Sequence, residues 1–184
     1  MRIIGGTHRR RILKTPYKQR PTLSFVRESL FNILQHHLLS IDTLKNSIIL
    51  DAYAGSGAIG LEALSRGAQK AIFFEKNYKV SQIIKENISL LGFIKKSKIY
   101  TINTINPPFS ENPVNIIFLD PPYNQNLILP SLLSLYKRGW INCKTLISIE
   151  RSIDESKVSM NNLDYVYYRK YRRCYIEFAY LRST

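Results

Sequence analysis

Acidic side chains and cysteines are both scarce in this chain of 184 residues. It has 13 Asp and Glu residues but 27 Lys and Arg residues, which leaves a formal net charge of +14. A charge of this size predicts a polyanionic partner, although a basic protein that merely stays in solution is the plainer alternative. The two cysteines, Cys143 and Cys174, are too few for a disulfide framework and lack metal-ligand spacing. We therefore expect reduced thiols, no bound metal and a cytoplasmic location.

Long apolar runs are absent as well. No stretch approaches the length of a membrane span, and the N-terminus (MRIIGGTHRRR) lacks the apolar core of a secretory signal. The chain is nevertheless 45% hydrophobic and 11% aromatic, so it can bury a sizeable core. Its length suits one domain with a small appendage. We expect a monomer that does not associate with membranes.

The positive charge is concentrated at the N-terminus. The first 20 positions contain no acidic residue and these seven basic ones: Arg2, Arg9, Arg10, Arg11, Lys14, Lys18 and Arg20. The segments RIIGG and RRRILK flank a short glycine-containing turn and can pair as a hairpin. We interpret residues 1–21 as a basic arm that binds phosphates, with Tyr17 as a stacking residue, and residues 22–184 as the main domain.

After the arm, strands and helices alternate. The patterns predict helices over 24–38, 58–67, 79–92 and 127–139, and strands over 47–53, 70–76, 98–103, 114–120 and 145–150. Strands that are apolar throughout indicate burial on both faces, as in a parallel sheet covered by helices. The expected fold is therefore a doubly wound, Rossmann-like α/β sheet, mostly parallel. Two last β-rich runs, 164–171 and 174–181, have no helix between them and predict a C-terminal antiparallel hairpin.

A glycine-rich turn follows the first expected strand. Gly55, Gly57 and Gly60 form G-x-G-x-x-G, and Glu75 ends the next strand about 20 residues after Gly55. The glycines let the backbone approach a ligand, and the acid can bind ribose hydroxyls. The motif alone leaves NAD, FAD and S-adenosylmethionine open as cofactors, besides a tight structural turn. Asp51 favours S-adenosylmethionine, because a carboxylate suits its cationic amino-acid part better than a pyrophosphate.

The fourth expected strand ends in Asp120-Pro121-Pro122-Tyr123, which we assign to catalysis. The carboxyl ends of parallel strands line one crevice, so Asp120 and Gly55 should share a pocket. The Asp120 carboxylate and the rigid Pro121 carbonyl can accept the two N–H groups of an exocyclic amine. Tyr123 offers a ring face on which a base can stack. A stiff turn at the end of a strand is the plainer alternative.

These motifs resemble amino-directed S-adenosylmethionine methyltransferases, and more closely the bacterial small-subunit (16S) ribosomal RNA guanine-N2 methyltransferases of the RsmD type. The matching stretches are MRIIGGTHRRRIL, RPTLSFVRESLFNIL, LDAYAGSGAIGLEALSRGA, FFEKN and FLDPPY. The resemblance implies S-adenosylmethionine as the cofactor and ribosomal RNA, free or in an assembled small subunit, as the partner. It also implies that a flipped guanine enters at Asp120 to Tyr123.

Two sets of site residues complete these expectations. The cofactor set is Asp51, Ala54, Gly55, Ser56, Gly57, Glu75, Lys76 and Asn103. The RNA-binding set is Arg9, Arg10, Arg11, Lys14, Arg20, Arg27, Arg172 and Arg173. The resemblance implies that residues 20–27 close over the site. The chain departs from the family at Asn103, where an acid usually contacts the adenine, at Arg10, where glycine is expected, and in the tail, which lacks a glycine before residue 174.

Other functions remain open on these residues. A DNA adenine-N6 or cytosine-N4 methyltransferase would use the same tetrapeptide, although such enzymes usually need a separate recognition region. A non-catalytic RNA-binding assembly protein would explain the charge but not the three acids at the strand ends. An NAD oxidoreductase would explain the glycines but not the charge.

Overall fold

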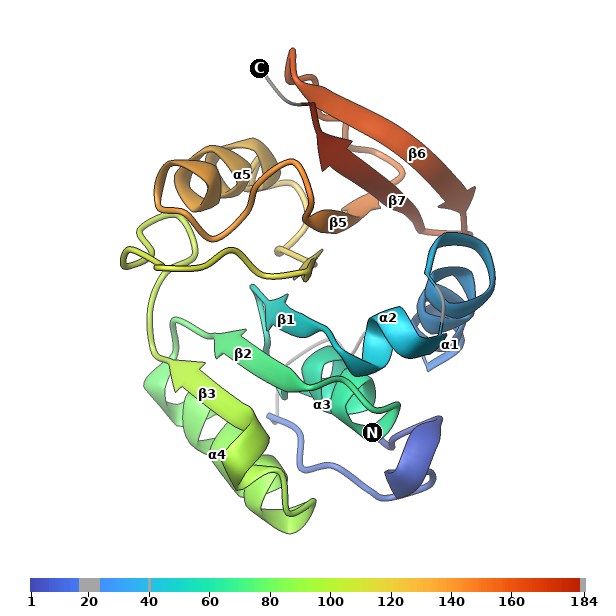
Figure 1. Cartoon of the computed structure of the whole chain (residues 1–184), viewed down its shortest axis with the longest axis vertical. Coiled ribbons are helices and arrows are strands. Elements are labelled where there is room, and N and C mark those ends of the chain that lie inside the picture. Colours follow the sequence, from blue (N-terminus) through green and yellow to red (C-terminus); the bar gives the residue numbers. More distant parts are fainter. Residues whose placement is uncertain (17–23, 40, 183–184) are drawn as a thin grey trace.

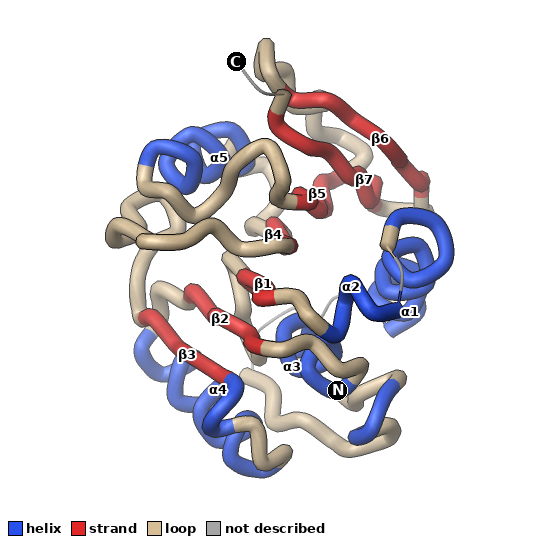
Figure 2. Tube along the Cα trace, in the orientation of Figure 1, coloured by secondary structure: helices blue, strands red, loops and turns tan. Residues whose placement is uncertain are grey.

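Seven strands form one sheet in the order β3-β2-β1-β4-β5-β7-β6 (Figures 1 and 2). The structure, a computed structural model, describes residues 1–16, 24–39 and 41–182. The strands are β1 (Ile48–Asp51), β2 (Lys70–Phe74), β3 (Ser97–Tyr100), β4 (Ile116–Leu119), β5 (Leu146–Ser152), β6 (Leu163–Lys170) and β7 (Cys174–Leu181). Strands β1 to β5 pair in parallel, whereas β7 pairs antiparallel with both β5 and β6. The predicted Rossmann-like sheet with its C-terminal hairpin is confirmed.

The sheet reverses its strand order between β1 and β4. The chain proceeds from β1 outward to β2 and β3, then returns to place β4 on the other side of β1. In open α/β sheets, ligands bind where the order reverses, outside the carboxyl ends of the strands. In β1 that end is Asp51, which pairs with Phe118 of β4 two residues before Asp120.

Helices cover both faces of the sheet. They are α1 (Ser24–Ile33), α2 (Ile41–Lys45), α3 (Ala58–Ser65), α4 (Tyr78–Leu90) and α5 (Ile128–Lys137). One face packs against α1, α3 and α4 through side chains such as Leu30, Leu61 and Ile84, and the other packs against α5 through side chains such as Leu132. Figure 1 shows α5 on one side of the sheet and α3 and α4 on the other. The apolar strands are therefore buried on both faces, as their composition predicts.

Helix boundaries differ from the expectation in one region. The helix expected over 24–38 is α-helical only to Ile33 and continues as a π-helical turn over Leu34–Leu38. The Leu39 N–H bonds to the Leu34 carbonyl at 2.8 Å, five residues back, so this turn is wider than an α-helical one. The short helix α2 was not predicted, because five residues are too few for a helical period to be recognised.

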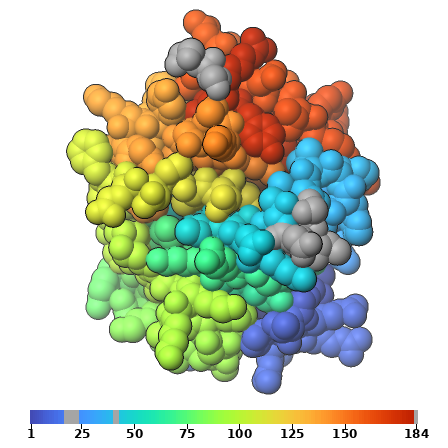
Figure 3. All heavy atoms as spheres, in the orientation of Figure 1, coloured from blue at the N-terminus to red at the C-terminus, as the bar shows by residue number. Residues whose placement is uncertain are grey.

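Residues 1–13 form an N-terminal hairpin that packs against the rest of the molecule. Arg2 and Ile12 form an antiparallel bridge, and the Ile3 N–H bonds to the Arg11 carbonyl at 2.9 Å. Ile3 and Leu13 are fully buried in the same core as α1 and α3. Figure 3 shows the hairpin, in dark blue, lying against the rest of the molecule. Arg10 has a φ of +73°, which explains why glycine is the expected residue at this position.

Strand β6 contains a β-bulge between Tyr165 and Tyr167. Before the bulge, Leu163 and Tyr165 pack on the α5 side of the sheet. After it, Tyr167 packs on the α1 side, where its ring stacks on His37 with centroids 5.6 Å apart. A bulge adds one residue to one strand, so side chains beyond it change faces.

Candidate functional site

A cavity of about 650 Å³ opens at the carboxyl ends of β1, β2 and β4. Cavities of this size, about 300–1,000 Å³, are typical of small-molecule sites. Eleven residues of the predicted cofactor and catalytic sets line it: Asp51, Ala54, Gly55, Ser56, Glu75, Lys76, Asn103, Asp120, Pro121, Pro122 and Tyr123. The structure thus brings the glycine turn and the Asp-Pro-Pro-Tyr segment into one pocket. Arg173 lines it as well, from the turn between β6 and β7.

The three glycines of the turn serve different purposes. Gly55 lies on the pocket with a φ of +54°, which brings its backbone to the cavity wall. Gly57 does not line the pocket: its φ is +79°, and a side chain there would meet Ile84 at 3.2 Å. At Gly60 a Cβ atom would lie 2.3 Å from the Phe73 ring, so α3 can approach β2 only with glycine at this position. Gly57 and Gly60 therefore shape the turn, and Gly55 faces the cavity.

Asp51 ends β1 beneath the glycine turn. It is 2% exposed, and its Oδ2 accepts the Gly60 N–H of α3 at 3.0 Å. Burial raises the pKa of Asp51 to about 7, the Gly60 N–H opposes this rise, and the nearby charges of Asp120 and Glu75 add to it. Asp51 therefore joins β1 to the start of α3 while still forming part of the pocket wall.

Glu75 holds two turns at the pocket, the glycine turn after β1 and the turn before α4. Its Oε2 accepts the Gly55 N–H at 3.0 Å, and its Oε1 accepts the Asn77 N–H at 2.8 Å. The Asn77 side chain in turn accepts the Lys79 N–H at the start of α4. Asn103 lies at the same end, where its Oδ1 accepts the Ile105 N–H at 3.2 Å. A carboxylate oxygen has two lone pairs, so Glu75 can hold these turns and also accept a ribose hydroxyl.

Two carboxylates that sequence reasoning missed hold the Asp-Pro-Pro-Tyr segment. The Tyr123 hydroxyl donates to Oε1 of Glu150 at 2.6 Å, at the far end of the pocket. The Asn124 N–H donates to Oε1 of Glu155 at 2.7 Å. Burial, followed by the charge of Glu150, raises the pKa of Tyr123 above its usual value. No local pattern marks either acid, because both contacts join segments about 30 residues apart.

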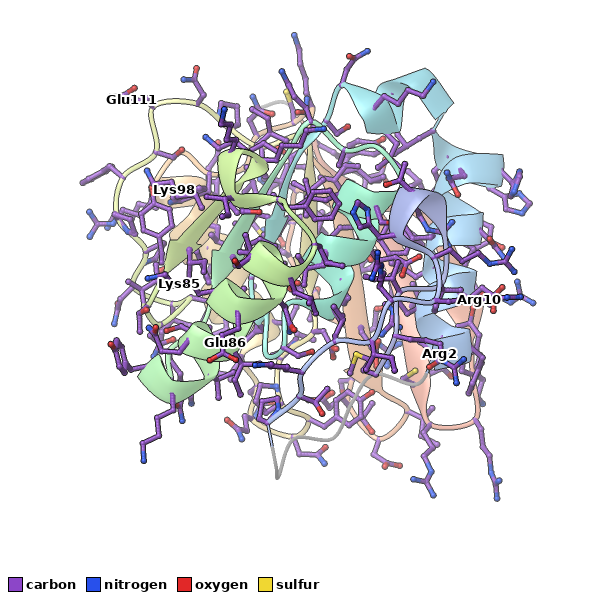
Figure 4. All side chains as sticks on the ribbon, turned by 90° about the horizontal axis from the view of Figure 1, so that it is seen from below. Arg2, Arg10, Lys85, Glu86, Lys98 and Glu111 are labelled. Atoms are coloured by element: carbon purple, nitrogen blue, oxygen red, sulfur yellow. The ribbon has the colours of Figure 1, made fainter. Side chains whose placement is uncertain are left out.

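The predicted RNA-binding residues fall into three groups. Arg9, Arg10 and Arg11 are exposed on the N-terminal hairpin, and Arg172 and Arg173 are exposed at the turn between β6 and β7. Figure 4 shows Arg2 and Arg10 extending outward from the hairpin, on the side opposite Lys98 and Glu111. Lys14 is exposed but pairs with Glu86 at 2.8 Å.

The prediction for Arg27 was wrong. Arg27 is 1% exposed beneath the hairpin, where it donates to the Arg2 carbonyl at 2.6 Å and lies 3.8 Å from the buried Glu62. An arginine on an amphipathic helix is normally placed at the surface, and only the tertiary structure reveals its buried acid. Arg20 and Tyr17 lie outside the described residues, as do residues 20–23, the first half of the segment expected to close over the site.

The described ranges contain neither a candidate membrane span nor a candidate metal cluster. Among residues 1–16, 24–39 and 41–182, no helix combines the length and hydropathy needed to cross a membrane. The same residues contain no group of three or more His, Cys, Asp or Glu side chains that could hold a metal ion.

Comparison with known proteins gives a consistent result. The family described as Conserved hypothetical protein 95 matches residues 1–180. The ribosomal RNA small subunit methyltransferase D of Escherichia coli K12 is 36% identical over 159 residues, which cover 84% of this chain and 76% of that protein. The protein of the same name from Haemophilus influenzae is 33% identical over 169 residues, covering 88% and 84%.

Solved structures agree with these relatives. The Escherichia coli protein yhhF superposes with a TM-score of 0.85 at 30% identity, over 100% of this chain and 99% of that one. An RNA methyltransferase from Salinibacter ruber, solved in complex with S-adenosyl-L-homocysteine, has a TM-score of 0.65 over 90% of this chain and 95% of that one. At 12% identity it shows a likeness of fold alone. The chain therefore belongs to the ribosomal RNA small subunit methyltransferase D family, and it is a methyltransferase with a Rossmann-like fold.

Proposed function

We propose that this methyltransferase transfers a methyl group from S-adenosylmethionine to the exocyclic N2 amine of a guanine in 16S ribosomal RNA. The observation that carries this proposal is the meeting of the glycine turn and Asp120–Tyr123 in one cavity. The names of the relatives, which specify small-subunit ribosomal RNA, and the net charge of +14 support the choice of an RNA substrate. We further propose that the enzyme acts as a cytoplasmic monomer without a metal, and that residues 1–21 form its RNA-binding arm.

The cofactor end of the pocket fits a nucleoside that carries an amino acid. When bound, S-adenosylmethionine supplies an electrophilic methyl group on a sulfonium. Glu75 can accept the ribose hydroxyls, and the Gly55–Ser56 backbone with Asp51 can hold the amino-acid part. Asn103 can accept the adenine amino group through its amide oxygen, which has a second lone pair besides the one that accepts the Ile105 N–H. These four contact points lie along the wall of one cavity.

At the base end, the chain orients the amine of the substrate. Asp120 accepts one N–H of guanine N2, and the Pro121 carbonyl accepts the other. The nitrogen can then pyramidalise, so that its lone pair points toward the methyl carbon. Transfer would form the nitrogen–carbon bond as the carbon–sulfur bond of the cofactor breaks, and Asp120 or solvent would accept the extra proton on nitrogen. Tyr123 offers its ring for stacking, and the chain's contribution is mainly orientation and charge.

The RNA must present its guanine outside the base stack to reach this pocket. Arg172 and Arg173 lie at the base end, and Arg173 lines the cavity itself. Arg9, Arg10 and Arg11 extend from the N-terminal hairpin. These two basic groups can bind the phosphates on either side of the flipped nucleotide.

A labelling experiment tests the proposal. The protein is incubated with methyl-labelled S-adenosylmethionine and, in separate reactions, undermodified small ribosomal subunits, free 16S RNA and duplex DNA. We expect label in RNA only, recovered as N2-methylguanosine after digestion to nucleosides. Label on DNA adenine or cytosine would favour the alternative substrate class. Binding of S-adenosylhomocysteine without label on any nucleic acid would contradict the substrate assignment.

A further inference from the structure

A buried carboxylate supports the ring that we assign to base stacking. Glu150 lies near the carboxyl end of β5, is 8% exposed, and accepts the Tyr123 hydroxyl at 2.6 Å. Cys174 begins β7, is 3% exposed, and has its thiol within hydrogen-bonding reach of both Glu150 and Tyr123. The end of β5 and the start of β7, which are neighbours in the sheet, therefore meet beneath the loop that follows β4.

The protonation states of Tyr123 and Cys174 determine whether each side chain can donate a hydrogen bond. Burial and the charge of Glu150 raise the pKa of Tyr123 above its usual value. The same two causes raise the pKa of Cys174 to about 12. Both groups keep their protons at neutral pH, and the Tyr123 hydroxyl donates to Glu150. The Tyr123 hydroxyl is thus committed to the protein, and only the ring face is available to a substrate.

The backbone beside the ring is held at a second point. Glu155 accepts the Asn124 N–H with Oε1 at 2.7 Å and the Ser152 N–H with Oε2 at 2.8 Å. One carboxylate therefore joins the loop after Tyr123 to the end of β5. The ring is fixed at its hydroxyl by Glu150 and its main chain is fixed by Glu155, so a displacement of either contact would change the direction of the ring face.

We propose that Glu150 is a positioning residue for methyl transfer, which acts by holding the Tyr123 ring toward the pocket through the phenolic hydrogen bond. Cys174 of the C-terminal hairpin is a second contact of the same carboxylate. The inference rests on the proposed function and assigns a role to the C-terminal hairpin, which closes the base end of the site. Glu150 also lines the cavity, and in this proposal it acts through the Tyr123 ring and not on the reacting atoms.

The test is a double-mutant cycle on methyl transfer to RNA. Glu150→Leu removes the acceptor, Tyr123→Phe removes the donor but keeps the ring, and the double variant removes both. We expect each single variant to lower kcat about tenfold, because a buried hydrogen-bonding group is left without its partner. The double variant should be no slower than the single ones, since two apolar groups replace a matched pair. Glu150→Gln keeps an acceptor and should stay within about threefold of wild type.

A binding measurement and a control variant distinguish a role of Glu150 in positioning Tyr123 from a general loss of structure. The affinity for S-adenosylhomocysteine, measured by calorimetry, should stay within about twofold in every variant, because the cofactor end is untouched. Glu111→Leu is the matched control, since Glu111 is exposed and lies on a remote loop (Figure 4). It should retain wild-type kcat.

Three results would overturn the inference. The first is a wild-type kcat in Tyr123→Phe. This variant tests the inference by itself if Glu150→Leu does not fold. The second is a double variant about a hundredfold slower than wild type, which would show that the two residues act independently. The third is a loss of cofactor affinity parallel to the loss of kcat. If the proposed function is wrong, the wild-type protein itself will leave guanine unlabelled. That result is distinct from the three above, which all require an active wild type.

Discussion

Asp51 and Asp120 end two neighbouring parallel strands, yet their surroundings differ. Asp51 is 2% exposed and bonds to the start of α3, whereas Asp120 is half-buried on the pocket wall. A carboxylate must be accessible to accept a hydrogen bond from a substrate. Asp120 therefore suits the substrate amine, and Asp51 suits the support of the cofactor loop.

Replacing Asp120 should separate catalysis from cofactor binding. In Asp120→Ala we expect kcat to fall at least about a hundredfold, because one acceptor that orients the amine is lost. The affinity for S-adenosylhomocysteine should change little, since the proposed cofactor contacts follow β1, β2 and β3. Single-turnover kinetics and calorimetry measure the two effects. A parallel loss of cofactor affinity would contradict this division of roles.

The raised pKa of Asp51 predicts how stability depends on pH. In the folded protein this carboxyl binds a proton up to a pH of about 7, whereas in the unfolded chain it ionises near 3.8. Its contribution to the free energy of unfolding is fully present below pH 3.8 and is lost as the pH rises from there through 7. Asp51→Asn should therefore lose less stability than wild type between pH 5 and 8, by an amount on the order of a few kcal/mol. Urea unfolding at several pH values checks this, and parallel curves would refute it.

Arg10 carries backbone strain that glycine would relieve. Its φ is +73°, a region that costs a non-glycine residue roughly 1 kcal/mol. Arg10→Gly should raise the free energy of unfolding by about that amount, while RNA affinity falls because one cation is lost. Arg9→Gly is the matched control, since Arg9 has a φ of −48° and gains nothing from glycine. Equal effects in the two variants would argue against strain as the cause.

At the scale of elements, one buried acid joins the N-terminal hairpin to α3. Glu62 is fully buried and accepts the Ile4 and Gly5 N–H groups at 2.7 Å each, and the Arg66 Nε–H at 2.8 Å. The buried Arg27 lies on the same carboxylate. The basic hairpin is thus fixed in place by charge-assisted hydrogen bonds as well as by Ile3 and Leu13.

Weakening that junction should loosen the hairpin. Glu62→Gln leaves Arg27 without a neutralising charge, so we expect a loss of about 3 kcal/mol in the free energy of unfolding. Hydrogen exchange should increase over residues 2–13. Glu86→Gln is the control: its pair with Lys14 is largely exposed and should contribute less than about 1 kcal/mol. Unchanged exchange in the hairpin would show that apolar packing alone holds it.

The same scale shows what local sequence patterns can predict. The meeting of the glycine turn and Asp120–Tyr123 in one pocket was predicted because each follows an apolar strand, and parallel strand ends meet at one edge. Glu150 and Glu155 were missed because their contacts depend on how β5 lies beside the loop after β4. Arg27 was misplaced for a related reason: its buried partner, Glu62, is 35 positions away in the chain. Periodicity identifies an element but not its polar contacts across the core.

For the whole molecule, charge is arranged in relation to the pocket. Basic residues extend from the N-terminal hairpin and from the turn between β6 and β7, where Arg173 reaches the cavity. A net charge of +14 also attracts RNA over a distance. The hairpin residues should therefore contribute contacts that depend on salt.

Removing the hairpin charges should change the salt dependence of RNA binding. The variant with Arg9, Arg10 and Arg11 replaced by Ala loses three cations, so the slope of log affinity against log salt should flatten by about 2. Titration of 16S RNA at several salt concentrations measures the slope. The affinity for S-adenosylhomocysteine in the same variant should equal that of wild type. An unchanged slope would mean that RNA does not contact the hairpin.

The bulge in β6 has a consequence for cooperativity. Because Tyr165 belongs to the layer under α5 and Tyr167 to the layer under α1, one hairpin completes both hydrophobic layers. Detaching the hairpin would expose apolar surface on both faces of the sheet at once. The free energy of this local opening should therefore approach that of global unfolding. The hairpin that closes the base end of the site should therefore unfold together with the whole domain, as a single cooperative unit.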